Sequence, residues 1–178
     1  MTHLIEPPQT GDAAAISQIQ LKAWLQTYPN KEAGIDEAWI RDHRGSTTTA
    51  EGIAQWREFI QEANNQPDRL FCRTVRSTAE IVGLMCGRRD EWVTLGPMYL
   101  LNEAQGHGTG SQLMSEFLDW AEDAPIRLWV TAYNERAIRF YERYGFTPTG
   151  EQELWKGRLP NMRMARGTAE HTGTRPPN

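Results

Sequence analysis

Gln105-Gly106-His107-Gly108-Thr109-Gly110-Ser111 places three alternating glycines between an apolar stretch and a segment of helical periodicity. The stretch at 92–101 is rich in β-forming residues, whereas apolar residues recur at helical spacing through 111–122, so a strand, a turn and a helix are expected. Glycine lets the backbone approach a ligand closely, and the free N–H groups and dipole of a helix N-terminus favour an anion. The turn therefore predicts a phosphate cradle.

Two common phosphate-binding motifs do not fit this turn. A P-loop ends in Gly-Lys-Ser/Thr, and the turn contains no lysine; the dinucleotide fingerprint needs a third glycine where Ser111 or Leu113 stands. A flexible turn that binds nothing is the alternative interpretation.

The rest of the chain indicates an α+β (α/β mixed) fold. Helices are expected before Tyr28, between residues 35 and 64 with an interruption at 45–49, over 111–122, and from a cap at Asn134 to Gly145. Strands are expected at 3–6, 70–76, 81–88, 92–101, 126–133, 146–154 and 159–165, the second to fourth joined by hairpins. We expect one domain over residues 1–166 and a disordered tail at 167–178, which has no large apolar residue.

Composition narrows the class of protein. The 178 residues are 39% hydrophobic, which excludes disorder throughout, and 19 Lys and Arg against 23 Asp and Glu give a net charge of −4. No broad cationic surface for nucleic acid or an anionic membrane is expected, and no apolar run is long enough to span a bilayer. Cys72 and Cys86 are too few for a disulfide framework and lack zinc-site spacing, so we expect buried thiols, no metal and a cytoplasmic protein.

A second motif, Asn134-Glu135-Arg136-Ala137-Ile138-Arg139-Phe140-Tyr141-Glu142-Arg143-Tyr144-Gly145-Phe146, follows later in the chain. It is similar to the Asn-x-x-Ala-x-x-Phe-Tyr-x-x-x-Gly-Phe segment of the GNAT superfamily of N-acetyltransferases. The glycine turn resembles the Gln/Arg-x-x-Gly-x-Gly/Ala signature of the same superfamily. The resemblance in residues runs from Met98 to Phe146, and the resemblance in element order covers most of the chain. It implies a mixed, mostly antiparallel sheet flanked by helices, splayed between the fourth and fifth strands to admit acetyl-coenzyme A, and it leaves a homodimer possible.

The resemblance also implies how acetyl-coenzyme A is held. Met98, Tyr99 and Leu100 would bind the pantetheine arm like an added strand, and an N–H near Leu100 would polarise the thioester carbonyl. The backbone from Gly106 to Ser111 would hold the pyrophosphate, and Asn134 would contact the pantetheine. His107 is expected to be an exposed turn residue with only a backbone role.

Tyr141 is the candidate general acid. It lies seven residues after Asn134, about two helical turns, so both side chains share one face of the helix. The resemblance implies that Tyr141 protonates the leaving thiolate, and a phenol with a pKa of about 10 is protonated at neutral pH. The alternative is a core aromatic residue beside Phe140 and Tyr144.

The general base is where the sequence departs from the family pattern. Thr94 stands where several family members carry a glutamate, and Glu91, beside Asp90, is the nearest carboxylate on the approach to that strand. Glu91 is thus the candidate base, although a hairpin turn explains it equally, and a water chain or an already neutral amine could replace a base. Gly96-Pro97 predicts a bulge or an edge in the same strand, because proline lacks a backbone donor.

The acceptor is expected to be a primary amine of a small molecule or peptide, acetylated by direct transfer. Trp24 and Tyr28, four residues apart in the first long helix, either line an acceptor pocket or belong to the core. The missing carboxylate at Thr94 keeps open a non-catalytic acyl-coenzyme A binding or sensory module. An interaction domain in which the glycines form only a turn is a further alternative.

Overall fold

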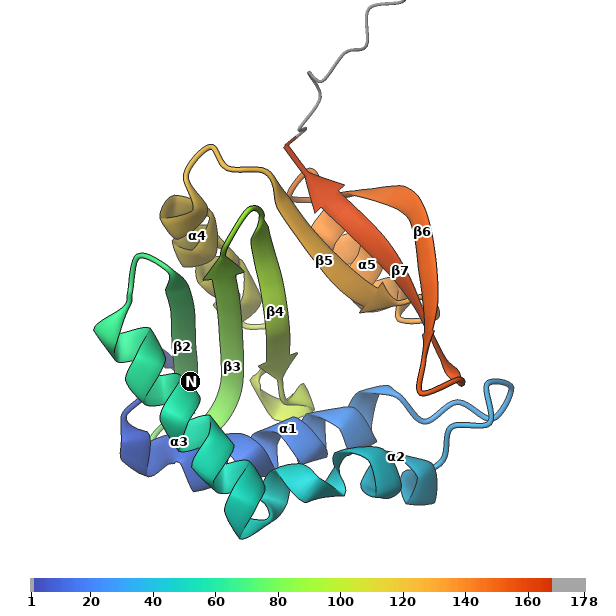
Figure 1. Cartoon of the computed structure of the whole chain (residues 1–178), viewed down its shortest axis with the longest axis horizontal. Helices are drawn as coiled ribbons and strands as arrows, with labels where there is room; N and C mark the ends of the chain where they lie inside the picture. The colour runs from blue at the N-terminus through green and yellow to red at the C-terminus, as the bar shows by residue number, and fades with distance from the viewer. Residues whose placement is uncertain (1, 168–178) are drawn as a thin grey trace, which may run out of the picture.

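A single seven-stranded sheet, in the order β1-β2-β3-β4-β5-β7-β6, organises the computed structural model, which describes residues 2–167 (Figure 1). All neighbouring strands are antiparallel except the β4–β5 pair, which is parallel. The strands are β1 (Leu4–Glu6), β2 (Leu70–Ser77), β3 (Glu80–Arg89), β4 (Val93–Leu100), β5 (Ile126–Thr131), β6 (Thr147–Trp155) and β7 (Leu159–Arg166). The helices are α1 (Ala13–Thr27), α2 (Glu37–Arg44), α3 (Ala50–Asn65), α4 (Thr109–Ala121) and α5 (Glu135–Glu142). The predicted α+β class and the mixed sheet are confirmed, and residues 168–178 of the tail expected at 167–178 lie outside the described residues.

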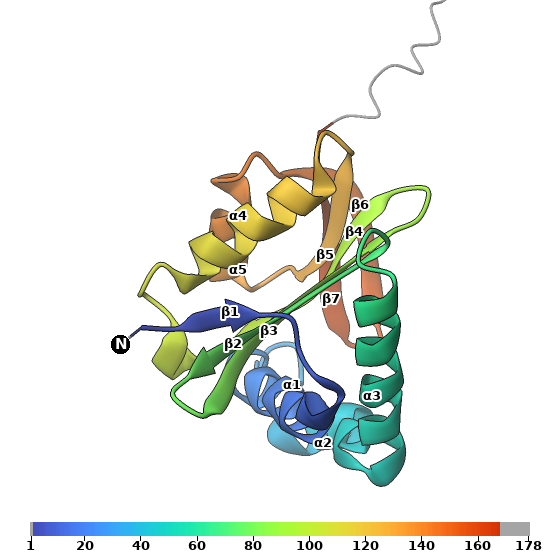
Figure 2. The ribbon, with the colours of Figure 1, turned by 90° about the vertical axis from the view of Figure 1, so that its left-hand side faces the viewer.

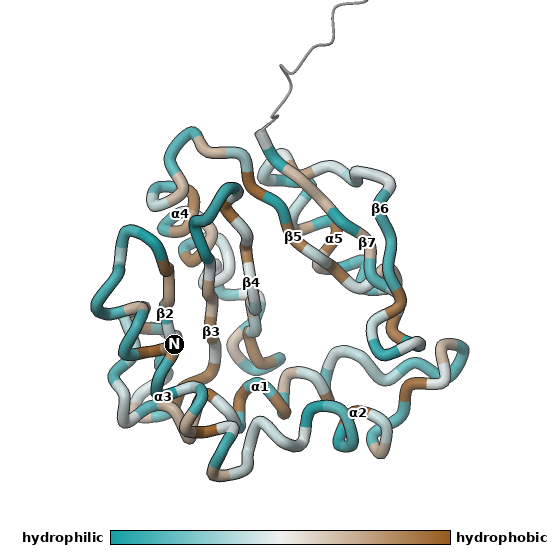
Figure 3. The backbone as a smooth tube through the Cα atoms, in the orientation of Figure 1, coloured by the Kyte–Doolittle hydropathy of each residue, from teal (hydrophilic) through white to brown (hydrophobic). Residues whose placement is uncertain are grey.

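Helices cover both faces of the sheet. Figure 2 shows α4 and α5 on one face and α1, α2 and α3 on the other. The core on the α4–α5 face centres on Phe117 and Met114, whereas Ile16 and Ile60 anchor the core under α1 and α3. In Figure 3 the hydrophobic colouring is concentrated in the central strands, and β6 is an exposed edge strand. Within the described residues, no helix combines the length and apolarity needed to cross a membrane.

The elements next to the glycine turn start and end slightly differently from the prediction. Helix α4 begins at Thr109, two residues earlier than expected, because Gly108 in a left-handed conformation (φ 79°) serves as its N-cap. Helix α5 ends at Glu142, and Gly145 (φ 84°) closes the turn that follows, where its N–H donates to the Glu142 carbonyl. Both shifts place glycines at positive φ, where other residues are strained.

Strands β4 and β5 separate soon after they meet. Their pairing is limited to Val93 with Ile126 and Thr94 with Arg127, and Figure 1 shows the two strands diverging from there toward α1. Before the carboxyl end of β4, the β3–β4 register shifts so that Gly96 and Pro97 lie opposite a single residue. The expected splay and the expected bulge are therefore confirmed, and the second half of β4 has one edge without a strand partner.

The two cysteines face each other across β2 and β3. Both thiols are buried, their sulfur atoms are 3.4 Å apart, and burial raises the pKa of Cys86 well above its ordinary value. The prediction that Cys72 and Cys86 are small buried residues is confirmed.

Candidate active site

A cavity of about 1070 Å³ lies along the open edge of β4; we call it the β4–β5 cavity. Its walls come from the carboxyl half of β4, the glycine turn, the start of α4, the end of α1 and helix α5. The predicted coenzyme-binding residues that line it are Met98, Tyr99, Leu100, Gln105, Gly106, Gly108, Gly110, Ser111 and Asn134. Segments that are far apart in the sequence thus converge on one site.

The open edge of β4 presents backbone donors to this cavity. The N–H of Leu101 donates to the Val82 carbonyl of β3 at 2.9 Å. Because backbone groups alternate in direction along a strand, the N–H groups of Leu100 and Met98 face away from β3, toward the open edge. The Leu100 carbonyl on that edge accepts a hydrogen bond from Gln105 Nε2 at 2.5 Å, which ties the glycine turn to β4. An extended amide chain can therefore pair with this edge as an added strand would.

The glycine turn offers a row of unpaired amides. Gly106 and Gly108 have φ of 83° and 79°, which explains the requirement for glycine at both positions. In the described part of the chain, no acceptor pairs with the backbone N–H groups of residues 106–111. A β-carbon at Gly110 would lie 3.5 Å from the Phe140 ring, so the turn also packs against α5. This arrangement suits a bound anion.

The other two turn residues face away from the β4–β5 cavity. His107 is exposed, and its ring lies at 5.8 Å from that of His3. Thr109 is buried, and its hydroxyl is 2.7 Å from His3 Nδ1. Neither side chain lines the cavity, so only their backbone can contact a ligand there.

Helix α5 forms the opposite wall. The Asn134 Oδ1 atom caps the helix by accepting from the Ala137 N–H at 3.2 Å, which leaves the side-chain NH₂ available. Arg136, Arg139 and Arg143 also line the cavity. These arginines were not predicted as site residues, although their i, i+3, i+7 spacing places them on one helix face.

Tyr141 lies at the inner part of this wall. Its side chain is 8% exposed, and its hydroxyl is 4.0 Å from the sulfur of Met98. Burial, and then the proximity of Tyr99, raise the pKa of Tyr141 above its usual value of 10. The phenol therefore keeps its proton at neutral pH and can donate it.

Tyr28 and Tyr99 lie near Tyr141, and Tyr133 contacts Tyr28. Burial, with Tyr99 and Tyr141 next in importance, raises the pKa of Tyr28, and burial raises the pKa of Tyr133 to about 12. The Tyr133 hydroxyl donates to the Tyr28 carbonyl at 2.6 Å, and Trp24 Nε1 donates to the Tyr99 hydroxyl at 2.9 Å. Of the two predicted acceptor residues, Tyr28 lines the cavity, whereas Trp24 is buried behind Tyr99 and does not.

The structure does not bring the candidate base to this site. Glu91 is exposed in the turn between β3 and β4, at the end where β4 still pairs with β5. The five steps of β4 from Val93 to Met98 already span roughly 16 Å at about 3.3 Å per residue, and Glu91 lies two residues before Val93. Thr94 pairs with Arg88 and Arg127 at the same end. The one carboxylate among the described lining residues is that of Glu142, which is exposed, so Glu91 is not placed to act as the base.

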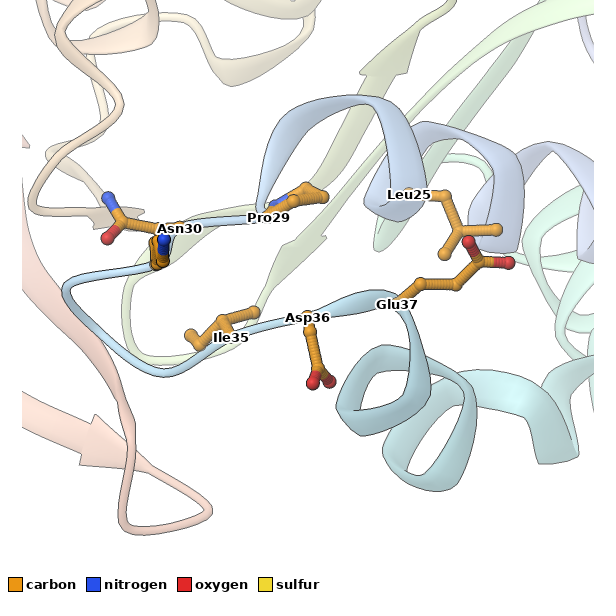
Figure 4. A pocket seen from close by; sticks show the side chains of 7 residues that line it. Leu25, Pro29, Asn30, Ile35, Asp36 and Glu37 are labelled. Atoms are coloured by element: carbon orange, nitrogen blue, oxygen red, sulfur yellow. The ribbon is translucent and has the colours of Figure 1, made fainter.

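A hollow of about 490 Å³ between the end of α1 and the start of α2 has a structural explanation (Figure 4). Asp36 Oδ1 accepts from the Trp39 N–H at 2.8 Å and caps α2, and Glu37 pairs with Arg41 at 2.7 Å. Both carboxylates therefore serve the helix. Across the described residues, no group of three or more His, Cys, Asp and Glu side chains could hold a metal ion.

Comparison with known proteins identifies the class that this geometry defines. The model of the acetyltransferase (GNAT) family matches residues 15–146. The chain therefore belongs to the GNAT family of acetyltransferases. It is 24% identical to a protein named "Probable N-acetyltransferase" from Mycobacterium tuberculosis over 132 residues, 74% of this chain and 68% of that protein.

Solved structures share the fold. The PaiA N-acetyltransferase of Thermoplasma acidophilum, crystallised with coenzyme A, is similar with a TM-score of 0.75 and 16% identity, over 94% of this chain and all of that one. A GNAT-family acetyltransferase of Streptococcus pneumoniae gives 0.71 and 18%, over 93% and 98%. The predicted family, fold and enzyme class are thus confirmed.

Proposed function

We propose that this enzyme transfers the acetyl group of acetyl-coenzyme A directly to a primary amine of a small molecule or peptide, in the β4–β5 cavity. The observation that carries the proposal is the position of the buried Tyr141 hydroxyl, 4.0 Å from the Met98 sulfur of β4. It lies in the same cavity as the free edge of β4 and the unpaired amides of the glycine turn. Positioned donors for an oxyanion and a leaving group are what acyl transfer requires.

The residues of the cavity fit the chemical groups of coenzyme A. The unpaired N–H groups of residues 106–111 suit the pyrophosphate, and Arg136, Arg139 and Arg143 add positive charge at the same wall. The outward N–H group of Met98 on the open edge of β4 suits the amide-containing pantetheine arm. The cavity volume of about 1070 Å³ matches a large ligand.

Each catalytic role falls to a group of this chain. Acetyl-coenzyme A supplies an activated thioester. The N–H of Leu100 donates to the thioester carbonyl as it gains negative charge, and Tyr141 donates its phenolic proton to the departing sulfur. The proton that the attacking nitrogen loses as it becomes an amide restores the phenol of Tyr141. Because no buried carboxylate lines the described cavity, the amine reaches the site neutral or releases its proton to water.

Calorimetry and a turnover assay test the proposal. We expect acetyl-coenzyme A to bind with a dissociation constant below millimolar, and an amine panel to release free thiol. Absence of binding at millimolar ligand would refute the coenzyme assignment. Binding without thiol release from any amine would instead support the acyl-coenzyme A binding module.

A further inference from the structure

A second cavity, of about 390 Å³, also reaches β4, one residue away from where the β4–β5 cavity reaches it. We call it the Arg44 cavity. Pro97 of the bulge lies in its wall, and Met98, the next residue, lies in the wall of the β4–β5 cavity. The other walls come from Cys86 of β3, from the segment between α2 and α3, and from α1, α2 and α3. These three helices cover the opposite face of the sheet from α4 and α5 (Figure 2). The two cavities thus reach the open part of β4 from its two sides.

Among the described residues that line this cavity, Arg44 is the one whose side chain is always charged. Its guanidinium carbon lies 4.3 Å from the ring centre of Trp24 and 4.6 Å from that of Trp155. Stacking on indoles occupies the faces of a guanidinium, whereas its N–H donors lie along the edges and stay available. No residue that the structure describes forms an ion pair or a hydrogen bond with these donors, and the Nε atom is buried without a partner. A buried donor without an acceptor is costly, so an incoming anion would be stabilised.

The neighbouring polar groups also favour an anion. Gln20 Oε1 accepts from Thr47 Oγ1 at 2.5 Å and from Trp56 Nε1 at 3.2 Å, which leaves the Gln20 amide NH₂ as a donor. The Nδ1 atom of His43 is 2.8 Å from the Trp39 carbonyl, which can only accept, so Nδ1 carries the proton, donates it to that carbonyl and holds the ring in place. The donors that this cavity offers to an anion are therefore the Arg44 guanidinium and the Gln20 amide.

We propose that the Arg44 cavity binds a carboxylate carried by the acceptor, so that the acceptor is a small amine with its own carboxylate, as in an amino acid. The fork of Arg44 matches a carboxylate in two parallel hydrogen bonds, and its single charge balances one negative charge. The volume of about 390 Å³ suits one small molecule. The inference deepens the proposed function and rests on it for the reaction. Amines without an anion, such as polyamines, are then poor acceptors.

Paired ligands test the inference. N-acetyl derivatives of the common amino acids resemble the expected products. For each of these acids, the matching ligand has a neutral carboxamide in place of the carboxylate and nearly the same shape. We expect calorimetry, with and without coenzyme A, to show at least one acid binding about 10- to 100-fold more tightly than its amide, the factor typical of a charge-assisted hydrogen bond. Arg44→Gln should abolish this preference.

Two further variants keep the test decisive. Arg158, whose guanidinium carbon lies 5.9 Å from the ring centre of Trp39 and which donates to the Gly34 carbonyl, provides the matched control, and Arg158→Gln should keep the preference. Arg44→Lys keeps the charge but loses the fork, and it should reduce the preference even if Arg44→Gln does not fold. Equal affinity for acids and amides in the wild type, or an unchanged preference in every folded Arg44 variant, would overturn the inference.

The test separates this inference from the proposed function. Thiol release with neutral amines, together with no preference for acids, would refute the Arg44 site and leave the acetyl transfer standing. Tight binding of acids without turnover of any amine would refute the acetyl transfer and leave the Arg44 site standing as a carboxylate-binding site.

Discussion

Replacing Tyr141 by phenylalanine removes the proposed acid and little else. The Tyr141 ring keeps its packing against Phe146, whose ring centre is 5.7 Å away. Among the described residues, the hydrogen-bond partner of the lost hydroxyl is the Met98 sulfur at 4.0 Å, so we expect the free energy of unfolding to change by no more than about 1 kcal/mol. Folding and coenzyme binding should therefore survive the substitution.

The expected effect on turnover follows from the leaving group. General acid catalysis contributes about 10²- to 10⁴-fold, and a thiol with a pKa of about 8.5 leaves as a weakly basic anion, so it needs less help than an alkoxide. We therefore expect kcat for Tyr141→Phe to fall about 100-fold, or roughly 2.7 kcal/mol at 1.36 kcal/mol per tenfold change. The KM for acetyl-coenzyme A should stay within about twofold, because the change acts on the transition state.

Single-turnover measurement of thiol release is the appropriate assay, since it isolates the chemical step from product release. Tyr144→Phe is the matched control, because Tyr144 lies beside Phe140 but does not line the cavity. Full single-turnover activity in Tyr141→Phe would refute the acid role. An equal loss in both variants would point to a structural effect.

Three other changes have defined outcomes. Gly108→Ala and Gly150→Ala both place a β-carbon at positive φ in open space, so each should lower the free energy of unfolding by about 1 kcal/mol, but only Gly108→Ala should weaken acetyl-coenzyme A binding in calorimetry. Gly87→Ala would overlap the Phe117 ring and should cost about 1–3 kcal/mol in urea unfolding, with partial rescue by Phe117→Leu. Because the pKa of Tyr141 is raised, the native state holds its proton above pH 10 while the unfolded chain loses it, so stability should fall there by up to about 1.4 kcal/mol per pH unit, with a shallower fall in Tyr141→Phe.

The parts of the site that the sequence predicted correctly are formed by local sequence. The glycine turn, the Asn134 cap and the position of Tyr141 depend on spacing within one turn or one helix, where the chemistry of glycine and asparagine determines the backbone. The bulge at Pro97 follows in the same way from the missing N–H. These features need no knowledge of distant residues.

The parts that could not be predicted depend on long-range packing. Nothing in the local sequence shows that Arg44 of α2 lies over Trp155 of β6, far along the chain. Glu91 was predicted as the base because it is close to Thr94 in sequence. In the structure the extended strand β4 separates Glu91 from the cavity. Trp24 has the helical position of a pocket residue, but Tyr99 covers it, and only the tertiary structure reveals that contact.

The bulge of β4 explains how one strand serves both cavities. Before it, the odd residues Val93 and Leu95 face the core on the α4–α5 side; after it, the even residues Met98 and Leu100 do so. One extra residue reverses the alternation of side chains along a strand. A regular strand would therefore turn Tyr99 toward α5, whereas the bulge turns it toward α1, where it meets Trp24 beneath Arg44. The same inserted residue thus positions Met98 beside Tyr141 in the β4–β5 cavity and places Pro97 in the wall of the Arg44 cavity.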